Sequence, residues 1–225
     1  MLEESVREWN PWWVEKRVPE VLKGVNRAAK NDVMQGMKMR QIKDIVGVRR
    51  CGKTTVIYQT IDTLIEGGAD PKSVVFLNFD DPEINEASFP ELMEAIYKIN
   101  PSVRYLFLDE AQQKPGWERW VRTLYDTRKF EQIIVSGSSA SLLSSDIARV
   151  LSGRHVTFEM YPFSFGEYLR FSGWREFDYD ALAAKRKELL HHLRAYMECG
   201  GFPEVLGKSE FERKKTLINV FNDIV

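Results

Sequence analysis

Residues 47–54 place glycine, lysine and threonine at a spacing that suits the binding of phosphate groups. They read Gly-Val-Arg-Arg-Cys-Gly-Lys-Thr, which fits the pattern G-x-x-x-x-G-K-[ST] of a P-loop. The glycines permit a tight turn that aims successive backbone N–H groups into one concavity. We expect Lys53 to reach the β- and γ-phosphates of a nucleotide and the Thr54 hydroxyl to ligate Mg²⁺. The other predicted binding residues are Gly47, Val48, Arg49, Arg50, Cys51, Gly52 and Thr55.

A second group with chemical potential is the pair of acids Asp109 and Glu110. They follow a run of apolar residues, which is the Walker B pattern of a buried strand that ends in carboxylates. Asp109 is expected to hold Mg²⁺ through water, and Glu110 is expected to orient and deprotonate an attacking water. The competing interpretations are a glycine turn with an incidental lysine for the P-loop and a pair of turn acids here.

Two further residues are candidates for sensing the γ-phosphate. Ser136 belongs to the cluster of small polar residues that ends the predicted strand 132–139, and a hydroxyl at such a strand end lies beside the γ-phosphate in P-loop ATPases with an inserted strand. Ser138 is the second candidate there, and a serine-rich turn that caps the next helix is the alternative. Arg154 follows Gly153 and precedes an alternating strand, so its guanidinium could reach a phosphate in its own or a neighbouring subunit. A surface salt bridge is the alternative for Arg154.

These residues require a sheet with helices between its strands. From residue 41 onward, strands alternate with helices, which predicts a parallel α/β sheet. We divide the chain into an N-terminal helical arm (residues 1–40), a P-loop core (41–162) and a helical, lid-like region (163–225). The predicted strands cover residues 42–46, 73–79, 103–110, 132–139 and 155–160. The predicted helices begin at Pro19 in the arm and then cover residues 54–66, 89–99, 117–128, 179–197 and 214–225, with a capping box at 164–167.

Composition sets limits on the class of protein. The chain has 225 residues and a formal net charge of −1, so no global basic field indicates nucleic acid. Its two cysteines show no metal-binding spacing, which suits a reducing cytoplasm. The absence of a long apolar run predicts no membrane span, and no signal peptide is apparent. Residues 1–50 carry 11 Lys/Arg against 7 Asp/Glu and include Trp9, Trp12 and Trp13, which either pack on the core or form a docking or base-stacking surface for a partner.

The ordered motifs resemble those of the prokaryotic, largely archaeal, AAA-type ATPases. The resemblance covers nearly the whole chain and rests on residues 10–13, 47–55, 106–112, 135–139, 151–154, 161–168 and 200–204. It implies an AAA/ASCE-type P-loop NTPase fold with sheet order 5-1-4-3-2, followed by a helical region. Members of this family usually continue into a further C-terminal domain. Because no stop signal follows Ile224, we expect the chain to be a fragment that ends before that domain.

The leading functional hypothesis is an ATPase that uses ATP and Mg²⁺ to drive a conformational change. The alternative is a nucleotide-gated module that binds DNA or another protein with little turnover. Both hypotheses are compatible with a homo-oligomer. A GTPase is disfavoured because no N/T-K-x-D motif follows the P-loop. We also consider that Asn78 or Asp80, at the end of a neighbouring strand, holds Glu110 away from water until a partner binds.

Overall fold

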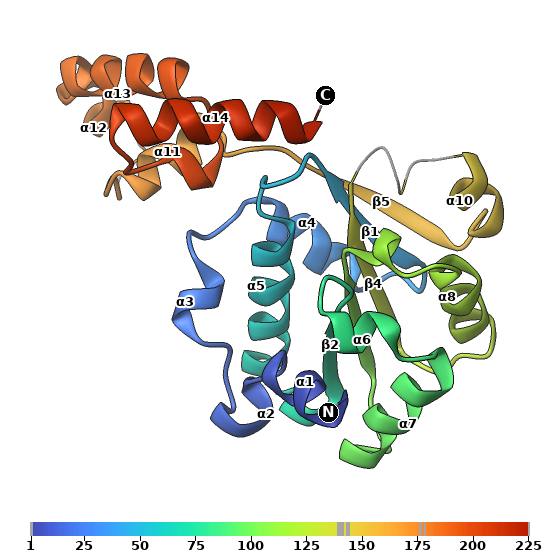
Figure 1. Cartoon of the computed structure of the whole chain (residues 1–225). Helices are drawn as coiled ribbons and strands as arrows, with labels where there is room; N and C mark the ends of the chain where they lie inside the picture. The colour runs from blue at the N-terminus through green and yellow to red at the C-terminus, as the bar shows by residue number, and fades with distance from the viewer. Residues whose placement is uncertain (1, 139–141, 143–144, 176, 178, 225) are drawn as a thin grey trace.

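The core of the molecule is a five-stranded sheet in the order β2-β3-β4-β1-β5, in which every pairing is parallel (Figure 1). The computed structural model describes residues 2–138, 142, 145–175, 177 and 179–224. The strands are β1 (Ile42–Gly47), β2 (Val74–Asn78), β3 (Tyr105–Asp109), β4 (Gln132–Gly137) and β5 (His155–Met160). This order is 5-1-4-3-2 when it is read from the other edge, so the predicted topology is confirmed. Ser139 and Val225, which the sequence assigned to a strand end and to the last helix, lie outside the described residues.

Burial along the strands follows their place in the sheet. All of β1 and β2 is buried, and β3 and β4 are buried except for their first residues. Continuous apolar runs of this kind are typical of parallel strands that are covered on both faces. β5 is mostly half-buried because it pairs only with β1 at the edge of the sheet. The alternating pattern of residues 155–160 therefore correctly predicted an edge strand.

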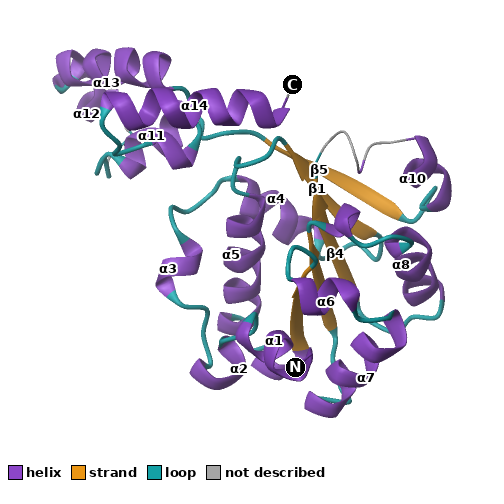
Figure 2. Ribbon diagram, viewed as in Figure 1, coloured by secondary structure: helices purple, strands orange, loops and turns teal. Residues whose placement is uncertain are grey.

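Helices cover both faces of this sheet. Figure 2 shows α5 on one side of the strands and α8 on the other. The helices that connect the strands are α5 (Lys53–Glu66), α6 (Pro82–Glu86), α7 (Phe89–Ile99), α8 (Trp117–Asp126) and α10 (Ser145–Val150), with short 3-10 turns η1 (Pro71–Ser73) and η2 (Ala111–Gln113). α7 begins with a full capping box between Ser88 and Glu91, which fixes the predicted start of this helix.

The N-terminal arm packs its tryptophans into the core. The arm contains α1 (Leu2–Glu8), α2 (Trp12–Glu15), α3 (Glu20–Lys23) and α4 (Ala29–Gly36). Trp12 and Trp13 are buried, and their indole N–H groups donate to the Val74 carbonyl at 3.1 and 2.8 Å. Trp9 donates to Asp81 at 2.9 Å. The tryptophans are therefore part of the core, and the base-stacking interpretation is wrong.

The helix expected from Pro19 onward is interrupted after α3. Gly24 adopts a left-handed φ of 52°, and α4 begins only at Ala29. The side chain of Gln59 on α5 holds the backbone at this break, because its amide nitrogen donates to the carbonyls of Lys23 and Val25 at 2.6 and 2.8 Å. The segment between α3 and α4 is thus shaped by α5.

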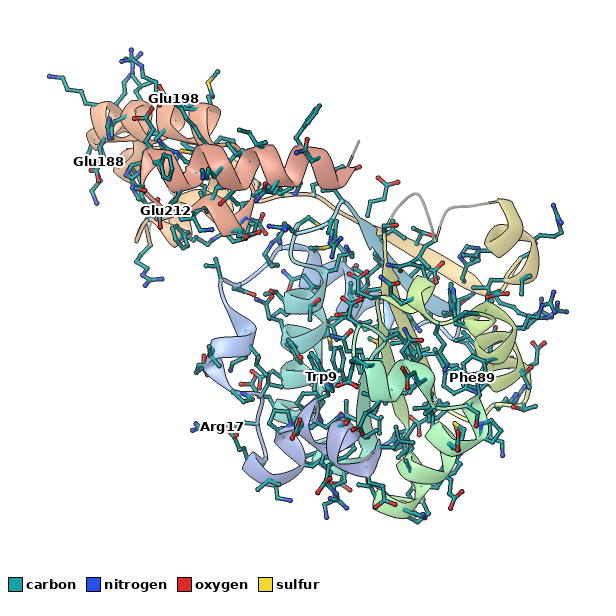
Figure 3. All side chains as sticks on the ribbon, viewed as in Figure 1. Trp9, Arg17, Phe89, Glu188, Glu198 and Glu212 are labelled. Carbon is teal, nitrogen blue, oxygen red and sulfur yellow. The ribbon has the colours of Figure 1, made fainter. Side chains whose placement is uncertain are left out.

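The C-terminal part of the chain is helical and stands apart from the sheet. It contains α11 (Phe165–Phe171), α12 (Tyr179–Ala184), α13 (Arg186–Cys199), η3 (Pro203–Val205) and α14 (Glu210–Ile224). Figure 3 shows Glu188, Glu198 and Glu212 of this part away from the side chains around the sheet. The single helix predicted over residues 179–197 is broken at Lys185, where the backbone leaves helical geometry (φ −101°, ψ 23°). Within the described residues, no helix has both the length and the apolar character needed to cross a membrane.

Candidate nucleotide site

The P-loop joins the end of β1 to the start of α5, which is the context that its pattern requires. Gly47 lies against β5, and a Cβ on it would come within 2.4 Å of the Met160 carbonyl oxygen. Gly52 has φ 97° and Arg50 has φ 67°, so the loop uses two left-handed backbone conformations. Such alternation turns successive N–H groups towards one point, which is how a backbone binds an anion. The start of α5 adds the favourable field of a helix N-terminus.

Lys53 is directed back over this loop. Its side chain is buried, and Nζ lies 3.3 Å from the Gly47 carbonyl oxygen and 3.4 Å from that of Val48. The same nitrogen lies 3.9 Å from Oε1 of Glu110. The structure therefore brings the predicted phosphate-binding lysine and the predicted general base into one place.

Asp109 is the buried centre of the site. The Thr54 hydroxyl donates to Oδ2 of Asp109 at 2.6 Å, and the Ser136 hydroxyl donates to Oδ1. Burial raises the pKa of Asp109, while the hydrogen bonds from Ser136 and Thr54 and the charge of Lys53 act in the opposite direction. Hydroxyl and carboxylate oxygens are the donors that Mg²⁺ prefers. Thr54 and Asp109 thus fit a magnesium ion, and Ser136 lies beside them, while its contact with a γ-phosphate stays a prediction.

Glu110 is held in an unusual backbone conformation, with φ 49° and ψ 44°. Non-glycine residues in this region are strained, and such strain is concentrated at functional sites. Its Oε2 accepts a hydrogen bond from Nε2 of Gln112 at 2.5 Å. The hypothesis that Asn78 or Asp80 holds Glu110 is therefore wrong: Oδ1 of Asn78 instead accepts from the Asp80 backbone N–H at 2.9 Å.

Gln112 is pressed against the end of β4. Its Oε1 is buried and has no hydrogen-bond partner among the described residues. A Cβ on Gly137 would lie 2.2 Å from this oxygen, so glycine is required for the close approach. Gln112 belongs to the Walker B segment, but its contact with Glu110 was not expected from the sequence.

Arg154 lies at the end of the sheet opposite to the P-loop, where β1 and β5 begin. Its carbonyl accepts from the Ile42 N–H at the start of β1, whereas the P-loop follows the end of β1. Its Nε donates to Oδ1 of Asp126 at 2.8 Å. The five further residues of β1 separate the two positions by about 16 Å, which exceeds the reach of an arginine side chain. Arg154 therefore does not contact a phosphate in its own P-loop, and a role in a neighbouring subunit stays a prediction.

Residues 39–169, more than half of the chain, match the sequence profile of the AAA domain (AAA_14). The chain belongs to this AAA family. It is 33% identical over 187 residues to an uncharacterised protein of Methanocaldococcus jannaschii and 32% identical over 189 residues to one of Haemophilus influenzae. These alignments cover 81% and 82% of the chain but only 40% and 45% of the relatives, so the chain spans less than half of their length.

The fold of this AAA domain is similar to that of a Walker-type ATPase of Pyrococcus abyssi, with a TM-score of 0.52. The similarity covers 91% of this chain and 74% of the other at 12% sequence identity. At that identity the likeness concerns the fold alone. It agrees with the strand order and with the position of the P-loop after β1.

Two residues outside the matched range contact the P-loop of the AAA domain. Nη1 of Arg27 donates to the Cys51 carbonyl at 2.5 Å, and Nη1 of Arg50 lies 2.7 Å from Oε2 of Glu204. Arg27 comes from the N-terminal arm and Glu204 from the helical region. Sequence reasoning did not connect either residue to the loop, because no motif links positions so far apart in the chain.

Proposed function

We propose that this AAA domain binds ATP with Mg²⁺ in the P-loop and hydrolyses it to ADP and phosphate. The observation that carries the proposal is the convergence of Lys53, Thr54, Asp109 and Glu110 at one edge of the sheet. Thr54 and Asp109 are joined at 2.6 Å, and Lys53 lies 3.9 Å from Glu110. This combination of a phosphate cradle, oxygen ligands and a carboxylate matches the needs of phosphoryl transfer to water.

Catalysis would depend on position and charge. The N–H groups of the loop and the ammonium of Lys53 bind the β- and γ-phosphate oxygens and orient the γ-phosphorus. Thr54 and Asp109 would hold Mg²⁺, which when bound neutralises charge on those oxygens. Glu110 accepts a proton from the attacking water while the oxygen of that water bonds to the γ-phosphorus. The bond from phosphorus to the ADP oxygen breaks, and ADP leaves with the electron pair.

Turnover would drive a conformational change in the helical region. This region lies over the end of the sheet where β1 passes into α5 (Figure 1). The Arg50–Glu204 contact joins it to the loop that holds the phosphates. A change from ATP to ADP alters the charge beside Arg50, so the position of η3 and α14 can respond to the nucleotide.

Two substitutions with matched controls test the proposal. Lys53→Ala should abolish tight ATP binding in calorimetry, because it removes the cation that reaches the phosphates. Glu110→Gln should bind ATP but hydrolyse it at least about a hundredfold more slowly. The exposed residues Lys72 and Glu86 provide controls with the same loss of charge, Lys72→Ala and Glu86→Gln, which should behave as wild type. Wild-type affinity in Lys53→Ala would refute the nucleotide site, and wild-type turnover in Glu110→Gln would refute the assigned base.

A second candidate function is nucleotide-gated binding of nucleic acid, and a basic depression supports it. A cavity of about 710 Å³ lies where the strands begin, at the edge opposite the P-loop. Its lining includes five basic side chains and one acid: Lys38, Arg40, Arg104, Arg128, Lys129 and Glu131. Of these cations, Arg104 is paired with Glu131, at 2.5 Å. The remaining cations suit a phosphate backbone, whose binding is mainly electrostatic.

Binding of labelled DNA with and without ATP tests this candidate. Lys38→Glu combined with Lys129→Glu should reduce DNA binding and lessen its dependence on salt, because fewer counterions are released. The pair Lys30→Glu and Lys72→Glu makes the same charge change elsewhere on the chain and should have little effect. Equal binding by both double variants would rule out the depression as the nucleic-acid surface.

A further inference from the structure

A single buried arginine connects the P-loop to two other parts of the chain. Arg27 lies between α3 and α4 and is only 3% exposed. Its three guanidinium nitrogens donate to three acceptors: Nε to Oε1 of Glu167 at 2.9 Å, Nη1 to the Cys51 carbonyl at 2.5 Å and Nη2 to the Tyr161 carbonyl at 2.7 Å. The guanidinium carbon lies 4.8 Å from the centroid of the Phe163 ring. The arm, the loop and the segment after β5 thus meet at one side chain.

The contact with Cys51 bears on how the loop binds phosphate. The N–H of Gly52 can point into the concavity only if the Cys51 carbonyl, which belongs to the same planar peptide, points away from it. Arg27 binds the Cys51 carbonyl, immediately before the left-handed Gly52. A Cβ on Gly52 would lie 2.6 Å from Nη1 of Arg27, so the guanidinium fills the space behind this glycine. Arg27 therefore supports the backbone orientation on which phosphate binding depends.

The other end of the contact lies in the first turn of α11. Oε1 of Glu167 accepts from Arg27 and from the Ala28 N–H at 3.0 Å, while Oε2 accepts from the Ser164 N–H at 2.8 Å. Burial opposes ionisation of Glu167, but the N–H groups of Ser164 and Ala28 and the Arg27 guanidinium outweigh it and lower the pKa of this carboxyl. Both partners are therefore charged, and the capping box that starts α11 is also the anchor of Arg27.

The second contact between the P-loop and the helical region, the Arg50–Glu204 ion pair, is more exposed. Arg50 and Glu204 pair at 2.7 Å, but their side chains are 32% and 39% exposed. Exposed ion pairs contribute little, whereas removing one partner of a buried pair is costly. Breaking the Arg27–Glu167 pair, whose side chains are 3% and 5% exposed, should thus cost more than breaking Arg50–Glu204.

We propose that Arg27 is a positioning residue that holds the P-loop in its phosphate-binding conformation and couples the loop to the docking of α11. The proposal rests on the nucleotide binding proposed above. It assigns a response to nucleotide to residues 26–28 and 164–168, which lie outside the P-loop.

Substitutions separate positioning of the loop from simple attachment of the arm. Arg27→Lys keeps the charge but replaces the three-way fork by one nitrogen, and ATP affinity in calorimetry should fall roughly tenfold or more. Lys23→Met is the matched control, because Lys23 ties the same arm to Asp62 at 2.7 Å without touching the loop. It should bind ATP within about twofold of wild type. Equal losses in both variants, at similar melting temperatures, would refute a specific role for Arg27.

Hydrogen exchange of the wild-type protein tests the coupling without any substitution. Adding ATP and Mg²⁺ should slow exchange in the loop and also in residues 26–28 and 164–168, while α7 stays unchanged. Protection confined to the loop and the Walker B segment would overturn the coupling alone. Absence of any protection in the loop would overturn the proposed nucleotide binding, and the coupling with it.

Discussion

Replacing Lys43 by methionine should change how the stability of this domain depends on pH. Lys43 lies on β1, the strand that leads into the P-loop, and its side chain is completely buried. Its Nζ donates to the Met39 carbonyl at 2.5 Å and to Oε1 of Gln132, both of which are neutral groups. Because burial disfavours the ammonium, it lowers the pKa of Lys43 from 10.5 to about 8.

The sign and size of the effect follow from this pKa. The unfolded chain keeps the proton on Lys43 up to a pH of about 10.5, whereas the folded protein loses it above a pH of about 8. Between these values the unfolded state binds more protons, so the free energy of unfolding rises with pH. The difference in pKa corresponds to about 3 kcal/mol in total, of which about 2.5 kcal/mol falls between pH 7 and pH 10.

Urea unfolding of wild type and of Lys43→Met across this pH range measures the effect. The free energy of unfolding of wild type minus that of the variant should increase by about 2.5 kcal/mol from pH 7 to pH 10. Burial also raises the pKa of Cys51 and of Tyr58, but both residues are present in the two proteins and cancel in the difference.

An exposed lysine provides the control. Lys72→Met makes the same chemical change on the surface, and its unfolding free energy should parallel that of wild type at every pH. A difference between wild type and Lys43→Met that stays constant within about 0.5 kcal/mol would refute the reasoning, since it would mean that Lys43 bears no burial cost.

Three further predictions concern single side chains. Gly137→Ala places a Cβ 2.2 Å from Oε1 of Gln112 and should displace this side chain, which binds the proposed base Glu110. We therefore expect kcat for ATP hydrolysis to fall roughly tenfold with little change in ATP affinity, whereas an equal loss of affinity would point to a general defect. The Asp44 carboxylate accepts a hydrogen bond from Nδ1 of His155 and so raises the pKa of His155. The stability from this contact is therefore present at low pH and is lost as pH rises through the folded pKa, and His155→Gln should flatten this fall above a pH of about 6.5 in unfolding experiments. Arg154→Ala should leave turnover unchanged in dilute protein, and a loss that appears only at high protein concentration would assign Arg154 to a neighbouring subunit's site.

Much of the nucleotide site could be predicted because its groups are close together in the sequence. The P-loop pattern is continuous from Gly47 to Thr54, and its chemistry follows from residue types alone. The apolar run before Asp109 predicted a buried strand that ends in an acid. In a parallel sheet the carboxyl ends of the strands share one edge, so Thr54 and Asp109 were expected to meet there, and the fold places them 2.6 Å apart.

The position of Arg154 shows a consequence of topology that its residue type does not reveal. Arg154 precedes β5, whereas the P-loop follows β1. Because the two strands are neighbours and parallel, these positions lie at opposite ends of the strands. The motif around Arg154 predicted the strand correctly, but the side chain could be assigned only after the strand's direction was considered.

The connections between segments were decided by the tertiary structure alone. Arg27 lies 24 residues from Cys51 and 140 residues from Glu167, and nothing in the local sequence marks it. Gln112 approaches Gly137, 25 residues further along the chain, because η2 packs against the end of β4. Periodicity and motifs reflect interactions between residues that are close together in the sequence. A buried charge is paired by whichever segments the fold packs around it, so its partner is known only when the fold is known.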